Sequence, residues 1–229
     1  MSLIREQDAL TVYLKLLETK GVGRDAILRR KEFLNSFIPL LADLANTGAQ
    51  YREALDSFMD AISGQHWPFN LAIAREYYAF WMNDFKAIAA YSAAPGYQEQ
   101  PISWQPADTS LKALWDIVDN AKFDLAESWA LKAYTRALRD ENAAQTLIDT
   151  RVKLAKVLLI QLKDAPVKHN LAYRISVDAT VPLFDIRQNR RLFLVVVREF
   201  FHFWSGNPEA AKYILQDANS APFNHTSFT

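Results

Sequence analysis

Two glutamates, Glu76 and Glu199, are the side chains of this sequence whose type and surroundings could support acid–base chemistry or ligand binding. Residues 75–81 read Arg-Glu-Tyr-Tyr-Ala-Phe-Trp, and residues 198–204 read Arg-Glu-Phe-Phe-His-Phe-Trp. At the spacing of an α-helix, Glu76 lies at the edge of an aromatic stripe, and Glu199 repeats that position. A half-buried carboxylate needs a cation, so a structural ion pair is the favoured role and a ligand anchor is the alternative. Nothing in the sequence supports a catalytic acid.

Arginines close to each carboxylate in the sequence supply the cations that we expect. Arg52 or Arg75 should pair with Glu76, and the second segment repeats this expectation with Arg174 or Arg198. Each Arg and Asp four residues apart also has the spacing of a salt bridge on one helical face. The candidate structural ion-pair residues are Arg52, Asp56, Arg75, Glu76, Arg174, Asp178, Arg198 and Glu199.

The spacing of Glu199 and His202 is that of two metal ligands on one helical face. A di-iron bundle needs two such motifs and two further glutamates, but the first segment has Ala79 where the second has His202. The chain has no cysteine, which removes thiolate sites and disulfides. We therefore expect no metal and no other cofactor.

A basic cluster surrounds the turn Gly21-Val22-Gly23. This glycine turn is similar to that of a helix-hairpin-helix, a motif that presents backbone N–H groups to DNA phosphate. The spacing after the glycines departs from that pattern, and a net charge of zero over the chain gives no global nucleic-acid footprint. The candidate nucleic-acid contacts are Lys20, Arg24, Arg29, Arg30 and Lys31.

Composition places the chain among ordinary globular proteins. It has 229 residues, of which 50% are hydrophobic and 23% are charged. No glycine-rich phosphate loop or serine nucleophile motif occurs, which weakens the case for an enzyme. Residues 1–10 have no apolar run, and no apolar stretch approaches the length of a membrane span. We expect a cytoplasmic protein without membrane association.

The two aromatic segments belong to a longer internal similarity. Their offset is 198 − 75 = 123 residues. Other matches keep nearly this offset: Tyr51, Arg52 and Asp56 recur at 122 as Tyr173, Arg174 and Asp178, and Tyr13, Leu17 and Ile27 recur at 121 as Tyr134, Leu138 and Ile148. Small changes in loop length explain a drift of two residues. The pattern predicts two tandem copies of one helical unit, offset by about 122 residues.

Apolar residues recur at helical spacing in both copies, and we predict an all-α fold of two similar helical bundles. Residues 192–197 favour a strand by propensity, but residues 70–74, their counterpart, have a helical pattern, so both should be helical. Pro39 should bend the second helix. Leu125 and Trp129 continue a helical pattern in the second copy.

The predicted domain organisation has four parts. A first unit spans residues 1–92, and a linker rich in Pro and Gln spans residues 93–108. A second unit spans residues 109–217, and residues 218–229 form a tail. The second unit contains an additional helical segment at its start.

These features favour a non-enzymatic interaction or scaffold protein that binds a protein partner or its own copies. The linker aromatics Tyr97 and Trp104 are the candidate interaction surface. A DNA-associated regulator that uses the basic cluster is one alternative. The other is a small-ligand or enzyme pocket between the copies, lined by Tyr78, Trp81 and Trp204.

Overall fold

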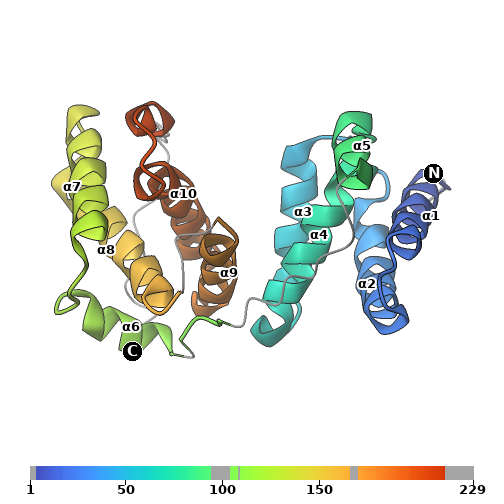
Figure 1. The fold of residues 1–229 in the computed structure, drawn as a ribbon, viewed down its shortest axis with the longest axis horizontal. Helices are drawn as coiled ribbons and strands as arrows, with labels where there is room; N and C mark the ends of the chain where they lie inside the picture. The colour runs from blue at the N-terminus through green and yellow to red at the C-terminus, as the bar shows by residue number, and fades with distance from the viewer. Residues whose placement is uncertain (1–3, 94–103, 108, 166–169, 215–229) are drawn as a thin grey trace. The chain divides into compact units, whose positions relative to one another are not determined.

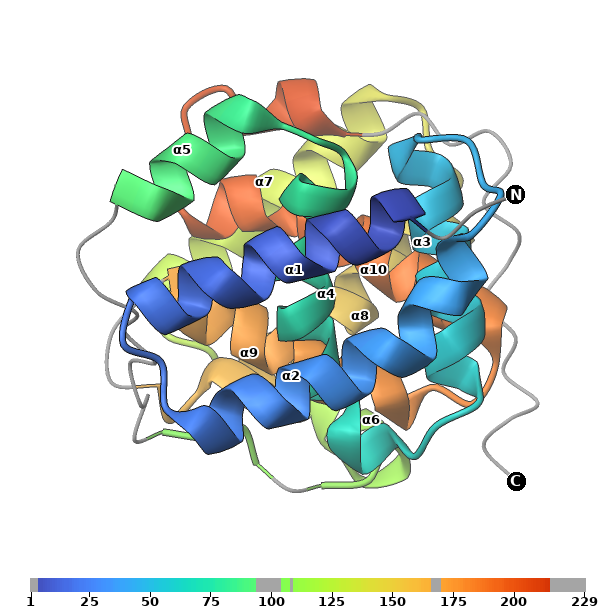
Figure 2. The ribbon, with the colours of Figure 1, turned by 90° about the vertical axis from the view of Figure 1, so that its right-hand side faces the viewer.

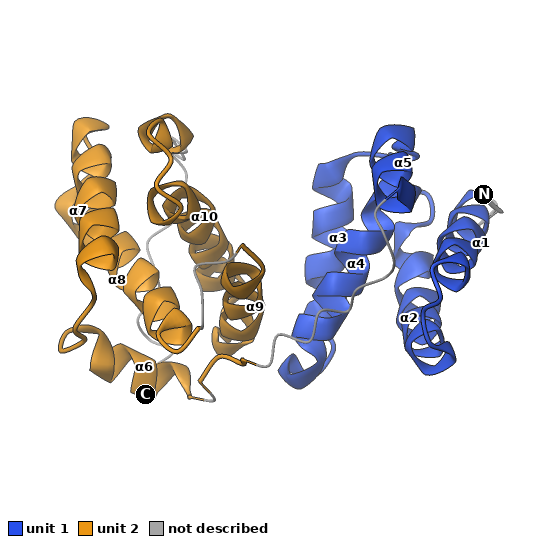
Figure 3. Cartoon of the chain, in the orientation of Figure 1, with its two compact units in different colours: residues 1–101 blue, residues 102–229 orange. Residues whose placement is uncertain are grey.

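The described part of the chain is all-helical. The computed structural model describes residues 4–93, 104–107, 109–165 and 170–214, and these contain no β-strand. They divide into two compact units, residues 1–101 and residues 102–229 (Figure 3). The predicted linker, residues 93–108, and the predicted tail, residues 218–229, lie mostly or wholly outside the described residues.

Unit 1 is built around the aromatic helix α4. Its described α-helices are α1 (Ile4–Thr19), α2 (Arg24–Phe37), α3 (Gly48–Asp60), α4 (Trp67–Trp81) and α5 (Phe85–Ala93). Helix α4 packs against α1, α2, α3 and α5. In Figure 2, α1 and α2 lie side by side with α4 behind them. The N-terminal, second and fourth helices therefore enclose one core.

Unit 2 is built around α10 in the same manner. Its described α-helices are α6 (Leu111–Val118), α7 (Leu125–Asp140), α8 (Gln145–Leu162), α9 (Asn170–Thr180) and α10 (Arg187–Trp204). Helix α10 packs against α7, α8 and α9 (Figure 1). Helix α6 packs on α8 through Leu114 and Val118. This helix is the predicted additional segment, and the Ser110 hydroxyl caps it by accepting from the Ala113 N–H.

Residues 192–197 lie within α10 and are helical, as predicted, and Val196 and Val197 are buried in the core. The β-branched residues lose rotamer freedom in a helix, but burial outweighs that small propensity cost. Pro39 was predicted to bend the second helix, but that helix ends before the proline. Helix α2 ends at Phe37, and Pro39 lies in the 3₁₀ segment Ile38–Leu41 that follows.

Left-handed residues end four of the described helices. Such a residue after the last turn lets backbone N–H groups return to the final carbonyls. For example, the Asn83 N–H donates to Phe80 O, and the Gly206 N–H donates to Phe203 O. The four residues and their φ angles are Gly21 at 75° after α1, Asn83 at 57° after α4, Asn142 at 58° after α7 and Gly206 at 74° after α10.

Some boundaries differ from the sequence prediction. Helix α5 follows directly after Asn83, where the sequence indicated no separate helix. The Asp84 carboxylate accepts from the Ala87 N–H and so starts this helix. The second unit ends, within its described part, in a 3₁₀ segment, Ala210–Tyr213. The aromatic helix of unit 2 begins at Arg187.

Candidate functional site

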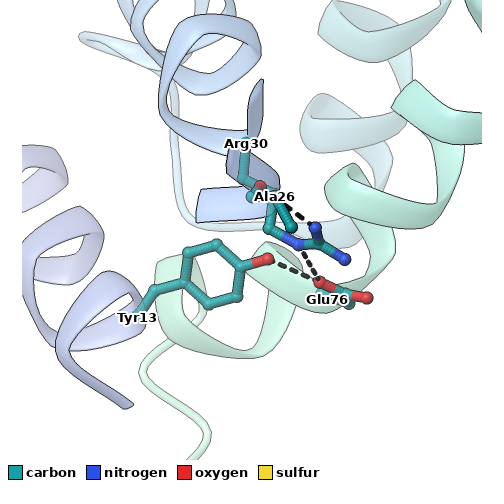
Figure 4. A network of polar contacts seen from close by, with 4 residues as sticks. All are labelled: Tyr13, Ala26, Arg30 and Glu76. Atoms are coloured by element: carbon teal, nitrogen blue, oxygen red, sulfur yellow. Dashed lines mark hydrogen bonds and ion pairs between the residues drawn. The ribbon is translucent and has the colours of Figure 1, made fainter. Parts of the chain in front are cut away.

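In unit 1, a carboxylate lies between a phenol and a guanidinium. The Tyr13 hydroxyl donates to Glu76 Oε2 at 2.5 Å, and Arg30 Nε donates to the same oxygen at 3.2 Å. Arg30 Nη1 also donates to Ala26 O at 3.1 Å, within α2. Figure 4 shows these groups converging from α1, α2 and α4. One polar cluster thus ties three helices together.

In unit 2, the same three residue types form a cluster between α7, α8 and α10. The Tyr134 hydroxyl donates to Glu199 Oε2 at 2.6 Å. Arg151 Nη1 donates to both carboxylate oxygens, at 2.8 Å and 2.7 Å. The contact is a charge-assisted hydrogen-bonded ion pair, the stronger kind of polar contact.

Burial distinguishes the two clusters. The side chains of Arg151 and Glu199 are 2% and 0% exposed, whereas those of Arg30 and Glu76 are 3% and 20% exposed. Both arginines are therefore buried, but the unit 1 carboxylate reaches solvent. Loss of one partner should therefore destabilise the cluster in unit 2 more than the cluster in unit 1, because a buried charge without its partner costs several kcal/mol.

The protonation states follow from this burial. Burial, and then the nearby Glu76 charge, raise the pKa of Tyr13 far above its ordinary value. Burial and the Glu199 charge act in the same way on the pKa of Tyr134. Burial lowers the pKa of Arg151, but Glu199 and Tyr134 raise it, and the net shift is upward. Each tyrosine is therefore a neutral donor, and Arg151 stays a cation.

Sequence reasoning missed both cationic partners. It pointed to Arg52 or Arg75 for Glu76, but Arg30 of α2 forms the ion pair that buries the carboxylate. A signal was present, because Ile27 and Ile148 align at an offset of 121 and an arginine stands three residues after each. Helices distant in sequence pack together at the core, so a cation far along the chain can reach each carboxylate.

The four predicted arginines have exposed side chains. Arg52, Arg75, Arg174 and Arg198 all lie on the solvent side of their helices. Arg52 Nε donates to Gly48 O at 2.9 Å, one turn back in α3. Asp178 is buried in α9, whereas Asp56 is half-buried in α3. The predicted Arg–Asp pairs stay predictions.

The basic cluster near the first glycine turn is divided between buried and exposed positions. Arg30 is 3% exposed and its guanidinium is paired with Glu76, so its predicted nucleic-acid contact stays a prediction. Lys20 Nζ donates to Ser92 O at 3.2 Å and lies over the Tyr91 ring. Arg24, Arg29 and Lys31 are exposed, and Arg29 lies 5.9 Å from the Phe69 ring centroid.

The tryptophans of the pocket hypothesis are each packed within their own unit. In unit 1, the Trp81 ring lies 5.1 Å from Tyr51, and Tyr51 lies 5.0 Å from Tyr78. In unit 2, the Trp204 ring lies 4.9 Å from Tyr173. Trp81 and Trp204 are buried, and Tyr78 is half-buried. A small-ligand site lined by these three residues stays a prediction.

The remaining candidates divide between the second aromatic helix and the linker. His202 stacks on Tyr213, with ring centroids 3.6 Å apart, while Glu199 is held in the unit 2 cluster. The described residues contain no group of three or more His, Asp or Glu side chains arranged to hold a metal ion. Of the predicted interaction surface, Trp104 is half-buried, and Tyr97 lies outside the described residues.

Comparisons with protein families, with curated proteins and with solved structures gave no match to this chain. Within the part that the structure covers, no helix is both long enough and apolar enough to cross a bilayer. The function is therefore argued from the two polar clusters and from the surfaces of the helices that they join.

Proposed function

We propose that this protein is a non-enzymatic interaction or scaffold protein, built from two similar helical units that arose by internal duplication. Its two Tyr–Glu–Arg clusters serve as structural fastenings, and its binding activity resides on exposed helical surfaces. The single observation that carries this proposal is the state of Glu76 and Glu199: each is already engaged by a tyrosine and an arginine of its own unit.

Matched side-chain contacts support the duplication. The residues of the two clusters correspond at offsets of 121 for Tyr and Arg and 123 for Glu. The Tyr51 hydroxyl donates to Ala74 O at 2.7 Å, and the Tyr173 hydroxyl donates to Val197 O at 2.6 Å. The same tyrosines tilt at 45° and 48° against the last tryptophan of their unit. Two unrelated bundles would have no reason to share this set.

Matched helix ends support it independently. Helices α1 and α7 each have 16 residues and begin at positions 4 and 125. The Val22 N–H donates to Leu17 O after α1, and the Ala143 N–H donates to Leu138 O after α7. The left-handed residues that follow α4 and α10 differ by 206 − 83 = 123 positions. These contacts depend on backbone geometry and not on side-chain chemistry.

The clusters favour a structural role over a catalytic one. A catalytic carboxylate needs access to substrate and a pKa suited to proton transfer. Glu199 is fully buried, and Tyr134 and Arg151 hold its two oxygens. Such an ion pair fixes how three helices pack, and its loss would destabilise the unit. Binding through surface residues then becomes the activity that this architecture best provides.

Crosslinking in the native host tests this function. The full-length tagged chain is crosslinked in living cells, purified under denaturing conditions and analysed by mass spectrometry, and each captured protein is then purified and mixed with the chain. We expect at least one captured protein to form a reconstituted complex with the folded chain. A charge-matched helical protein with the same tag serves as the control. The proposal fails if no captured protein rebinds, or if the chain instead shifts DNA in a salt-dependent manner that Arg24→Ala/Lys31→Ala abolishes.

A further inference from the structure

The outer face of α7 carries large apolar side chains that the packing of unit 2 leaves in solvent. Leu125 is 76% exposed and Trp129 is 63% exposed. The opposite face of the same helix is buried through Leu131, Tyr134 and Leu138. Among the described residues of unit 2, none buries this second face of α7, and its apolar residues do not belong to the border of the core.

Cations continue this face along the helix. At 100° per residue, the exposed residues other than Ala126 and Ala133 fall in one sector about 100° wide. We call this sector the α7 stripe, and it consists of Leu125, Trp129, Lys132, Arg136, Arg139 and Asp140. Its charge is three cations minus one anion, or +2, on a chain whose net charge is zero. The apolar end and the basic end follow each other along the axis.

The geometry of the stripe is set by contacts at both ends. A capping box fixes the start of α7: Asp124 Oδ1 accepts from the Glu127 N–H, and Glu127 Oε2 accepts from the Asp124 N–H. Both acidic side chains at this end are thereby engaged with backbone. Lys132 Nζ lies 5.6 Å from the Trp129 ring centroid, a cation–π distance. Arg136 Nε lies 3.9 Å from Asp140, and both side chains are highly exposed.

The corresponding helix of unit 1 lacks this stripe. At the offset of 121, Trp129 corresponds to Asp8, which is exposed on α1. Lys132 corresponds to Thr11, and Arg139 corresponds to Glu18. Arg136 corresponds to Lys15, so α1 keeps one of the three cations. A helix that packs on its unit in the same manner thus needs neither the tryptophan nor the other two cations. This comparison rests on the duplication put forward above, and it separates the stripe from the requirements of the fold.

We propose that the α7 stripe is a docking surface for an acidic amphipathic helix of another protein. The apolar face of that helix covers Leu125 and Trp129, and its Glu or Asp side chains, one to three turns further on, meet Lys132 and Arg136. Exposed tryptophan and arginine are the residues most often found at the energetic centre of interfaces. This inference deepens the proposed interaction function by naming its surface and the chemistry of its partner.

Charge decides against a second copy as the occupant. A symmetric pairing of two α7 stripes would bring six cations together against two anions, and like charges at close range oppose association. The arrangement also decides against a lipid surface. A helix that lies on a membrane carries its apolar side chains along its whole length with cations on both flanks. In the α7 stripe, the apolar residues lie at one end and the cations at the other. A partner helix with an apolar first half and an acidic second half would match this order.

Two synthetic peptides of about 18 residues, five helical turns, provide the test. Both carry leucines at helical spacing in their first half. One places glutamates on the same face of its second half, and its twin places lysines there. Binding to the full-length chain is measured by fluorescence anisotropy. We expect the glutamate peptide to bind and the lysine peptide not to bind.

Three variants of the chain locate the binding. Trp129→Asp, which introduces the residue found at this place in α1, should weaken binding of the glutamate peptide about tenfold or more. Lys132→Glu/Arg136→Glu should exchange the preference toward the lysine peptide. Val12→Asp alters an exposed apolar residue of α1 and should change nothing. All four substituted positions are exposed, so circular dichroism should report an unchanged fold.

Several outcomes would overturn the docking surface. These are equal binding by Trp129→Asp, no exchange of preference by the charge reversal, self-association that Trp129→Asp abolishes, or capture by anionic vesicles in place of the peptide. A host protein that reconstitutes equally well with Trp129→Asp would also remove the stripe while leaving the interaction function intact. If no host protein rebinds at all, the proposed function itself fails. The peptide experiment still decides whether the α7 stripe binds an acidic amphipathic helix.

Discussion

Removing the Glu199 carboxylate should destabilise unit 2 more than any comparable change in unit 1. The change Glu199→Gln keeps the volume of the side chain but leaves the Arg151 cation buried without a counter-charge. Because both side chains are at most 2% exposed, water cannot replace the lost partner. Breaking a buried ion pair in this way costs about 3–5 kcal/mol.

The matched control is Glu76→Gln in unit 1. There the carboxylate is 20% exposed, and Arg30 reaches it through Nε at 3.2 Å while Nη1 is satisfied by Ala26 O. The loss should therefore be close to that of one hydrogen bond to a charged group, about 1.5–3 kcal/mol. The difference between the two variants measures the effect of burying the carboxylate.

A rescue variant separates charge from packing. The triple change Tyr134→Phe, Arg151→Met and Glu199→Leu removes the phenol, the cation and the carboxylate together and fills the space with apolar atoms. Apolar replacement of a whole buried ion pair is often neutral or stabilising. We therefore expect the triple variant to recover most of the stability that Glu199→Gln loses.

Hydrogen exchange followed by mass spectrometry is the suitable assay, because it reports each unit separately. A loss of 3–5 kcal/mol raises the opening constant of the slowest amides by about two to four orders of magnitude. The increase should appear in peptides of α8 and α10 and not in those of α2 and α4. The reasoning is refuted if Glu199→Gln costs no more than Glu76→Gln, or if the triple variant is less stable than the single one.

Four further substitutions have expected outcomes. Burial and the Glu199 charge raise the pKa of Tyr134, so the contribution of its neutral phenol to stability is fully present below about pH 10, the unfolded value, and is lost as the pH rises above it. In Tyr134→Phe, urea titrations above pH 10 should therefore show a free energy of unfolding that declines less steeply with pH, by about 1.4 kcal/mol per pH unit. Gly206→Ala should cost about 1 kcal/mol in thermal unfolding, because φ is 74° and an added Cβ meets open space, so the cost is conformational; Asn83→Gly at the matching place should change stability by less than about 0.5 kcal/mol. Asp124→Ala removes the capping box of α7 and should cost about 0.5–2 kcal/mol, with faster amide exchange in its first turn.

Periodicity and turn residues predicted the helices, because they act locally. Glycine at positions 21 and 206 marks helix ends where a left-handed residue is needed, and Pro39 marks the point where α2 changes to a 3₁₀ segment. Comparison of the two halves overrode the strand propensity of residues 192–197, and α10 is helical there. At the glycines and at Pro39 the determining interaction lies within a few residues along the chain, whereas burial in the core decides for residues 192–197.

The ion pairs could not be read from local sequence, because they join separate helices. Arg30 is 46 residues from Glu76, and Arg151 is 48 residues from Glu199. The helical pattern also placed Trp129 in an apolar series, yet its ring points to solvent while Leu131 and Tyr134 of the same helix are buried. Helix α7 has two apolar sectors, and periodicity by itself does not say which of them packs on α8 and α10.

The buried ion pairs and the exposed tryptophan of α7, which local sequence did not predict, have one physical explanation. A carboxylate locked between a tyrosine and an arginine fixes the packing of three helices in each unit, so substitutions at those positions are costly in both. Exposed positions of α1 and α7 have no such constraint. There the two halves differ, for example with Asp8 in one and Trp129 in the other. If the units are copies, their shared interior holds the fold while unshared surfaces provide distinct binding faces, and the α7 stripe is the face whose apolar exposure packing within unit 2 does not explain.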